Sequence, residues 1–165
     1  MKNTTNFTPG SYVVYPGHGL GKVTSLESQT FAGQEVRCLV ITFDHDRMTL
    51  KVPVSKAKTS GLRGLSSPSH MQKALTTMTG RASGKKVMWS RRATEYAAKI
   101  KSGDPILIAE VVRDLHREPD QPQGSYSERL LYEQARDRLT REVAAIEGIE
   151  VDAATTKFEL LLKAA

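Results

Sequence analysis

The first third of the chain alternates apolar and polar positions in short runs separated by turn residues. Because successive side chains of a strand point to opposite faces, a period of two predicts strands. We expect strands at residues 12–15, 22–26, 35–43 and 48–52, with a hairpin loop at 30–34. The run 35–43 is apolar on both faces, with Leu39, Ile41 and Phe43 on one and Val36, Cys38 and Val40 on the other. A strand of this kind is typical of the centre of a sheet, so the pattern predicts a small β-barrel.

From residue 65 onward, the apolar positions recur every three to four residues, which is the period of amphipathic helices. Five helices are expected from their start and stop signals, which are Ser67 before Pro68, Ser90, Asp104 before Pro105, Ser125 with Glu128, and Gly148 before Val151. The change of period predicts two domains, residues 1–64 and 65–165. The expected fold class is α+β, with a small β-barrel followed by an all-helical domain of about five helices.

The stretch 85–92 sets the only tryptophan of the chain, Trp89, among the basic residues Lys85, Lys86, Arg91 and Arg92. Cationic groups at this density favour phosphate, and an indole beside them could stack on bases or wedge between them. The alternative is structural, with Ser90 capping a helix and Trp89 folded back on it as a hydrophobic staple. The residues alone favour neither interpretation over the other.

The charge is unevenly distributed along the chain, whose net charge is +6. Residues 65–102 carry eight basic residues and one acidic residue, whereas residues 103–165 carry eight basic and thirteen acidic residues. A basic block ahead of an acidic segment indicates that one part of the protein binds a polyanion.

The single cysteine, Cys38, cannot form an internal disulfide, which fits a reducing cytoplasm. Residues 1–6 have no apolar core of a secretory signal, and no run approaches the roughly 18 apolar residues of a membrane span. We therefore expect a cytoplasmic protein without a membrane partner, in which Cys38 is a small core residue.

No pattern in the sequence indicates catalysis, a metal or a cofactor. The glycines of residues 17–22 precede extended residues rather than a helix, which excludes a phosphate-binding loop. The four histidines, His18, His45, His70 and His116, lack metal-ligand spacing. Tyr12 and Tyr15 fall on opposite faces of one strand, which argues against an aromatic cage for methyl-lysine.

Several motifs, taken in order, resemble the CarD/CdnL family of bacterial transcription regulators. They are Gly10-Ser11-Tyr12-Val13-Val14-Tyr15-Pro16-Gly17-His18-Gly19, Val52-Pro53, Trp89-Ser90-Arg91-Arg92, Ser102-Gly103-Asp104, and Ala109-Glu110-Val111-Val112-Arg113-Asp114-Leu115. The resemblance runs through most of residues 7–146. Its first part alone is also similar to the polymerase-binding domain of the transcription-repair coupling factor.

This resemblance implies a Tudor-like or SH3-like first domain that binds the RNA polymerase β subunit, and a helical second domain that touches promoter DNA. The tryptophan that the family wedges into the minor groove falls on Trp89, with Arg91 and Arg92 beside it for phosphates. The polymerase-contacting positions fall on Gln29 and Lys51, where some relatives carry arginine. No catalysis is implied.

The resulting hypothesis is a monomeric, non-enzymatic transcription regulator, nucleoid-associated through RNA polymerase, that stabilises the promoter open complex with little sequence reading. The alternative is a protein-protein adapter, on polymerase or another partner, that does not touch DNA. A hydrolase or nuclease is a third possibility, but the sequence has no clustered acid-base or metal-binding set to support it.

Overall fold

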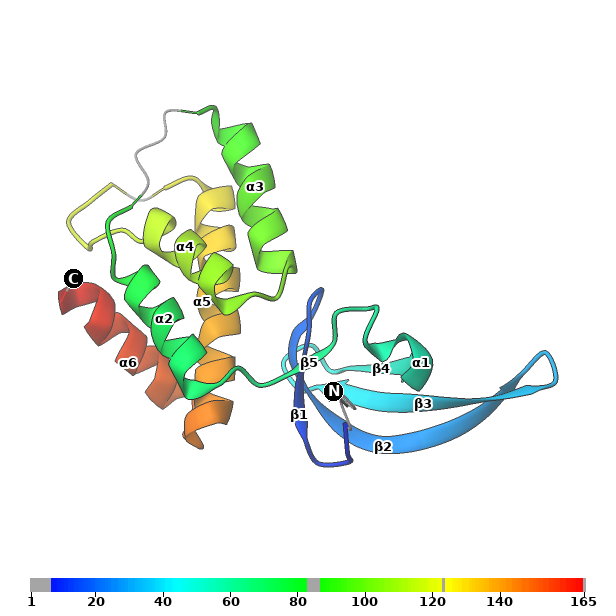
Figure 1. Cartoon of the computed structure of the whole chain (residues 1–165). Coiled ribbons are helices and arrows are strands. Elements are labelled where there is room, and N and C mark those ends of the chain that lie inside the picture. Colours follow the sequence, from blue (N-terminus) through cyan, green and yellow to red (C-terminus); the bar gives the residue numbers. More distant parts are fainter. Residues whose placement is uncertain (1–6, 83–86, 123, 165) are drawn as a thin grey trace. The chain divides into compact units, whose positions relative to one another are not determined.

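The computed structural model describes residues 7–82, 87–122 and 124–164 (Figure 1). The chain divides into two compact units, Met1–Leu65 and Ser66–Ala165. The first unit contains the strands β1 (Tyr12–Tyr15), β2 (Gly19–Phe31), β3 (Gln34–Phe43), β4 (Met48–Pro53) and β5 (Arg63–Gly64), with the short helix α1 (Val54–Ala57). The second contains the helices α2 (Pro68–Met78), α3 (Trp89–Lys101), α4 (Pro105–Leu115), α5 (Tyr126–Glu147) and α6 (Val151–Ala164). The predicted α+β class is confirmed.

The strands of the first unit form one antiparallel sheet with the order β4-β3-β2-β1-β5. β3 lies between two neighbours, as its apolar residues predict. Leu39, Ile41 and Phe43 on one face of β3 pack into the core of the unit and are at most 2% exposed. The glycine-rich segment after β1 forms the turn into β2, which is the role that the sequence indicated.

The hairpin between β2 and β3 is longer than the sequence predicts. β2 continues to Phe31, which pairs with Gln34, so the loop consists of Ala32 and Gly33 alone. Both have positive φ, 49° and 79°, as a two-residue type I′ turn requires. Polar residues late in β2 weaken the alternating pattern, but backbone pairing with β3 keeps them extended. The two strands form a long ribbon in Figure 1.

A glycine on β2 allows the sheet to pack closely over its own core. A Cβ added at Gly21 would lie 2.7 Å from Ile41 Cγ2 and 2.8 Å from Phe43 Cε1. We expect Gly21→Ala to lower the free energy of unfolding by about 1–3 kcal/mol, because the core must shift to admit the methyl group. Gly64→Ala is the matched control, since a Cβ there meets nothing within 4 Å. Urea unfolding of both variants measures the difference, and equal losses would contradict this packing.

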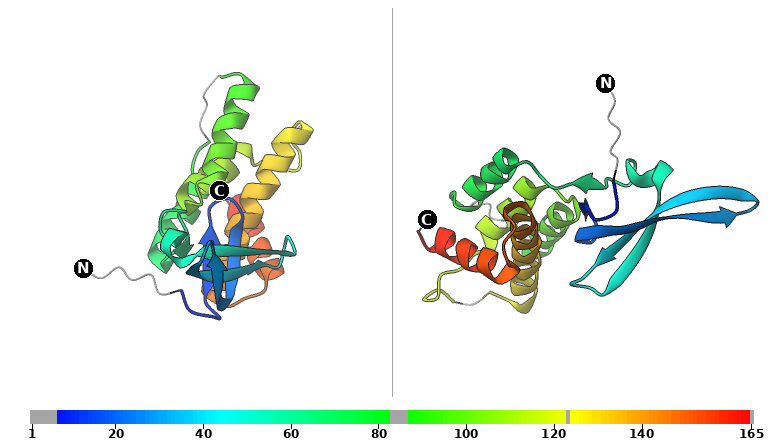
Figure 2. Two further views of the ribbon diagram at one scale, coloured as in Figure 1. Left: turned by 90° about the vertical axis from the view of Figure 1, so that its right-hand side faces the viewer. Right: turned by 90° about the horizontal axis from the view of Figure 1, so that it is seen from below.

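The second unit is built around α4, which packs against α2, α3 and α5 (Figures 1 and 2). Ala109, Val111 and Val112 of α4 are completely buried. Tyr96 and Ile100 turn the apolar stripe of α3 toward the same core. This core fixes α3 and α5 beside each other, and their first turns carry the site described below.

The helix boundaries follow the local signals of the sequence at most positions. Ser67, Asp104 and Ser125 each accept a hydrogen bond from a backbone N–H of the first turn of α2, α4 and α5, at 3.2, 2.9 and 3.3 Å respectively. Gly148 ends α5 with a left-handed φ of 67°. These predicted caps are confirmed, whereas the start of α3 is different.

Candidate nucleic-acid interface

Trp89 is the first residue of α3, and Met88 is the N-cap. The carbonyl oxygen of Met88 accepts from the N–H groups of Arg91 and Arg92, both at 3.1 Å. Ser90 therefore lies inside the first turn, and the expectation that it caps the helix is wrong. The helix begins without a side-chain cap.

The indole of Trp89 is partly buried and packs on the edge of the helical core. Its Nε1–H donates a hydrogen bond to Ser127 Oγ at 2.9 Å. Its centroid lies 6.3 Å from that of the Tyr96 ring, with 48° between the planes. The ring thus packs on the core with one side and is partly open to solvent. This arrangement combines a feature of the staple interpretation with a feature of the wedge interpretation.

Arg92 lies against the aromatic rings. Its guanidinium carbon is 5.7 Å from the centroid of Trp89 and 5.5 Å from that of Tyr96, within the range of cation–π attraction. Its Nη2 also donates to the Tyr96 hydroxyl at 3.0 Å. This hydrogen bond, helped by the charges of Glu128 and Asp114, holds the pKa of Arg92 above its ordinary value against the effect of burial. Arg92 is therefore a permanently charged support for the Trp89 ring.

The remaining basic candidates differ in how far the structure describes them. Arg91 is exposed on the first turn of α3, beside Trp89 in the sequence. Lys85 and Lys86 lie outside the described residues. Met88, which the sequence did not single out, is 78% exposed next to Trp89.

The two predicted polymerase-contacting residues lie on one face of the sheet in the first unit. Gln29 of β2 pairs with Val36 of β3, and Lys51 of β4 pairs with Val40 of β3. Cross-strand partners point to the same face, and positions 36 and 40 of one strand also share a face. This face is opposite to the one that carries Ile41 into the core.

An acidic residue that the sequence analysis did not single out sits beside Lys51. Glu27 Oε2 lies 3.2 Å from Lys51 Nζ, and each side chain is 47% exposed. Glu27 lies on β2, two residues before Gln29, and its cross-strand partner on β3 is the buried Cys38. The candidate polymerase surface therefore carries an exposed ion pair, whose strength is small because water screens it.

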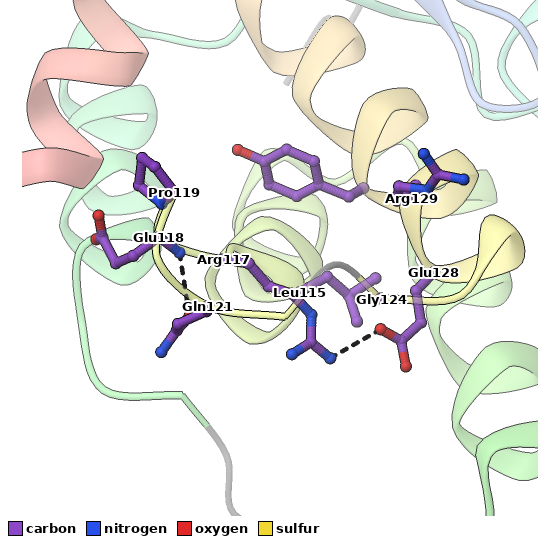
Figure 3. Close-up of a pocket in the computed structure, with 9 residues that line it drawn as sticks. Leu115, Arg117, Glu118, Pro119, Gln121, Gly124, Glu128 and Arg129 are labelled. Atoms are coloured by element: carbon purple, nitrogen blue, oxygen red, sulfur yellow. Dashed lines mark hydrogen bonds and ion pairs between the residues drawn. The ribbon is translucent and has the colours of Figure 1, made fainter.

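The second unit also has a pocket of about 210 Å³ between the end of α4 and the first turns of α5 (Figure 3). Its lining residues are Leu115, Arg117, Glu118, Pro119, Gln121, Gly124, Glu128, Arg129 and Tyr132. Arg117 Nη2 donates to Glu128 Oε2 at 2.9 Å within this lining. Burial raises the pKa of Tyr132, so its phenol stays neutral. The Tyr132 hydroxyl also lies 3.2 Å from Nδ1 of His116.

The described residues are 7–82, 87–122 and 124–164. None of the helices in those residues has the length and apolar character needed to cross a membrane. Across the same described ranges, no three His, Cys, Asp or Glu side chains lie together as metal ligands.

Both units match known protein families. Residues 7–66 match the CarD-like/TRCF RID domain, and residues 73–159 match the CarD C-terminal domain, a match that spans more than half of the chain. The chain is also 29% identical over 143 residues to the "Putative transcription factor YdeB" of Bacillus subtilis (strain 168), covering 87% of this chain and 94% of that protein. The chain therefore belongs to the CarD family, with a CarD-like/TRCF RID domain followed by a CarD C-terminal domain.

Proposed function

We propose that this protein is a non-enzymatic transcription regulator that binds the RNA polymerase β subunit through residues 1–64 and stabilises the promoter open complex through Trp89. The family of both units supports a regulator that acts with polymerase. The observation that carries the DNA contact is the ring of Trp89, supported by Arg92 and Ser127, with exposed Arg91 on the same helical turn. Promoter DNA is the proposed second partner, in its minor groove at the upstream edge of the bubble.

Small energies suffice for such a function. Promoter melting is near balance, so a protein that binds the opened form better than the closed duplex shifts the population by its differential affinity. A stacking or wedge contact contributes about 1–3 kcal/mol, and each 1.4 kcal/mol changes the population or lifetime roughly tenfold. Because polymerase brings the protein to promoters, the tryptophan does not need to read sequence.

Footprinting of a promoter with this protein, in the presence and absence of polymerase, tests the proposal. We expect protection at the upstream edge of the bubble only when polymerase is present, together with slower dissociation on challenge with competitor. An adapter that binds polymerase without touching DNA would leave that edge unprotected. This result would contradict the proposed DNA contact while leaving the polymerase contact intact.

Binding to free DNA should be weak, insensitive to sequence and steeply dependent on salt, because phosphate contacts dominate it. Arg91→Glu should weaken this binding and lower its salt slope by about one, since one cation near the backbone is lost. Lys163→Glu on α6 makes the same charge change at another exposed position and is the control. Fluorescence anisotropy of a labelled duplex over a salt series measures both slopes. An unchanged slope for Arg91→Glu would exclude a phosphate contact at this residue.

A further inference from the structure

The indole of Trp89 has a single polar atom, and the protein itself uses it. Nε1–H donates to the hydroxyl oxygen of Ser127 at 2.9 Å, a normal length for such a bond. Ser127 lies in the first turn of α5, 38 positions later in the chain. The hydrogen bond therefore connects the start of α3 with the start of α5.

The ring is also restrained by groups from α3. Arg92 lies 5.7 Å from its centroid, and the Tyr96 ring lies 6.3 Å away. Tyr96 in turn donates its hydroxyl proton to Asp114 Oδ2 of α4 at 3.4 Å. Contacts with Arg92 and Tyr96 resist displacement of the ring, but neither of them binds the polar Nε1 edge. Among the residues that the structure describes, Ser127 is the one that binds this edge.

We propose that Ser127 is a positioning residue for Trp89, which orients the indole before DNA arrives and keeps its N–H away from the bases. The consequence for DNA rests on the proposed function, whereas the orientation of the ring does not. A side chain that is already held in its bound orientation loses less conformational freedom on binding. Ser127 therefore adds to the stability of the open complex without touching DNA.

The same hydrogen bond explains how a tryptophan can contact a groove without selecting a sequence. Base pairs present acceptor atoms in the minor groove, and a free indole N–H could bond to them. In this protein the N–H is already bonded to Ser127, so the carbon edge and faces of the ring meet the DNA. The contact is then apolar and nearly equal for all base steps.

The free protein gives the first test. Because the chain has a single tryptophan, its NMR spectrum has one indole N–H signal, and its tryptophan fluorescence comes from Trp89 alone. Ser127→Ala should speed hydrogen exchange of the indole N–H several-fold and increase quenching of the emission by acrylamide. Ser127→Thr, which keeps the hydroxyl, should restore both values. Ser90→Ala removes another exposed serine hydroxyl from the same turn as Trp89 and should change neither. Unchanged exchange and quenching in Ser127→Ala would overturn the proposal.

The second test measures the lifetime of polymerase–promoter open complexes with full-length variants. Because water competes for an exposed hydrogen bond, Ser127→Ala should shorten the lifetime by only about two- to fivefold. In a Trp89→Phe background, which has no N–H, Ser127→Ala should have no further effect. An equal effect in both backgrounds would show that Ser127 acts on stability alone and would overturn the positioning role. A third outcome is that Ser127→Ala frees the ring but Trp89→Ala leaves the lifetime unchanged. This would contradict the proposed DNA contact of Trp89, while the orientation of the ring by Ser127 in the free protein would be supported.

Discussion

Replacing Trp89 with alanine should shorten the lifetime of promoter open complexes by about five- to 150-fold, while binding to polymerase remains. The expected loss follows from the stacking or wedge energy of one aromatic ring, about 1–3 kcal/mol. Polymerase binding should persist because Gln29 and Lys51, the proposed contacts, belong to the other unit. Competitor challenge of preformed complexes measures the lifetime.

The stability of Trp89→Ala separates the role of the ring in packing on the helical core from its proposed role in contacting DNA. Truncation of a fully buried tryptophan costs about 3–5 kcal/mol, and Trp89 is only partly buried. We therefore expect a loss of about 1–3 kcal/mol in the free energy of unfolding, which leaves the protein folded in the assay. Trp89→Phe keeps a flat ring, so the open-complex lifetime with this variant should lie between those with the original protein and with Trp89→Ala. A lifetime that is unchanged in the folded Trp89→Ala variant would exclude the wedge.

Reversing the charge of Lys51 should reduce binding to polymerase at least tenfold. Lys51→Glu removes the proposed cation. It also places a carboxylate close to that of Glu27, whose Oε2 lies 3.2 Å from Lys51 Nζ in the original protein. Like charges this close on one face of the sheet repel, even with β3 between their strands, and a reversed charge at a complementary interface costs several kcal/mol. Pull-down or titration with the isolated polymerase β subunit measures the loss.

Exchanging the two charges distinguishes a contact between Lys51 and polymerase from an effect of the ion pair between Glu27 and Lys51. Glu27→Lys combined with Lys51→Glu restores an attractive pair on the sheet but puts the cation on β2 instead of β4. We expect this double variant to fold as the original protein does and to bind polymerase weakly. Normal binding by the double variant would contradict a specific contact at Lys51, because only the pair itself would then matter.

The sequence predicted the elements whose signals are local. Ser67-Pro68 and Asp104-Pro105 begin helices because a side-chain acceptor and a fixed φ act within one turn. The full length of β2, the strand β5 and the helix α1 were not predicted. Their residues carry weak patterns, and they are ordered by pairing or packing with distant segments.

The site shows the same limit. The basic residues around Trp89 marked the stretch from composition alone, yet nothing near Ser127 in the sequence indicates an indole partner 38 positions earlier. The expectation that Arg92 lies beside Trp89 for phosphates stays a prediction, but the sequence did not indicate its contacts with Tyr96, one helical turn later. Glu27 was missed because its contact with Lys51 crosses β3 and depends on the register of three strands.

A cryo-EM map of the protein bound to polymerase on a promoter bubble tests the central claim most directly. The account predicts that residues 1–64 lie on the β subunit and that the Trp89 ring enters the minor groove at the upstream edge of the bubble. It also predicts that Arg91 lies near a backbone phosphate there. A map in which the first turn of α3 faces polymerase or solvent, away from DNA, would contradict it.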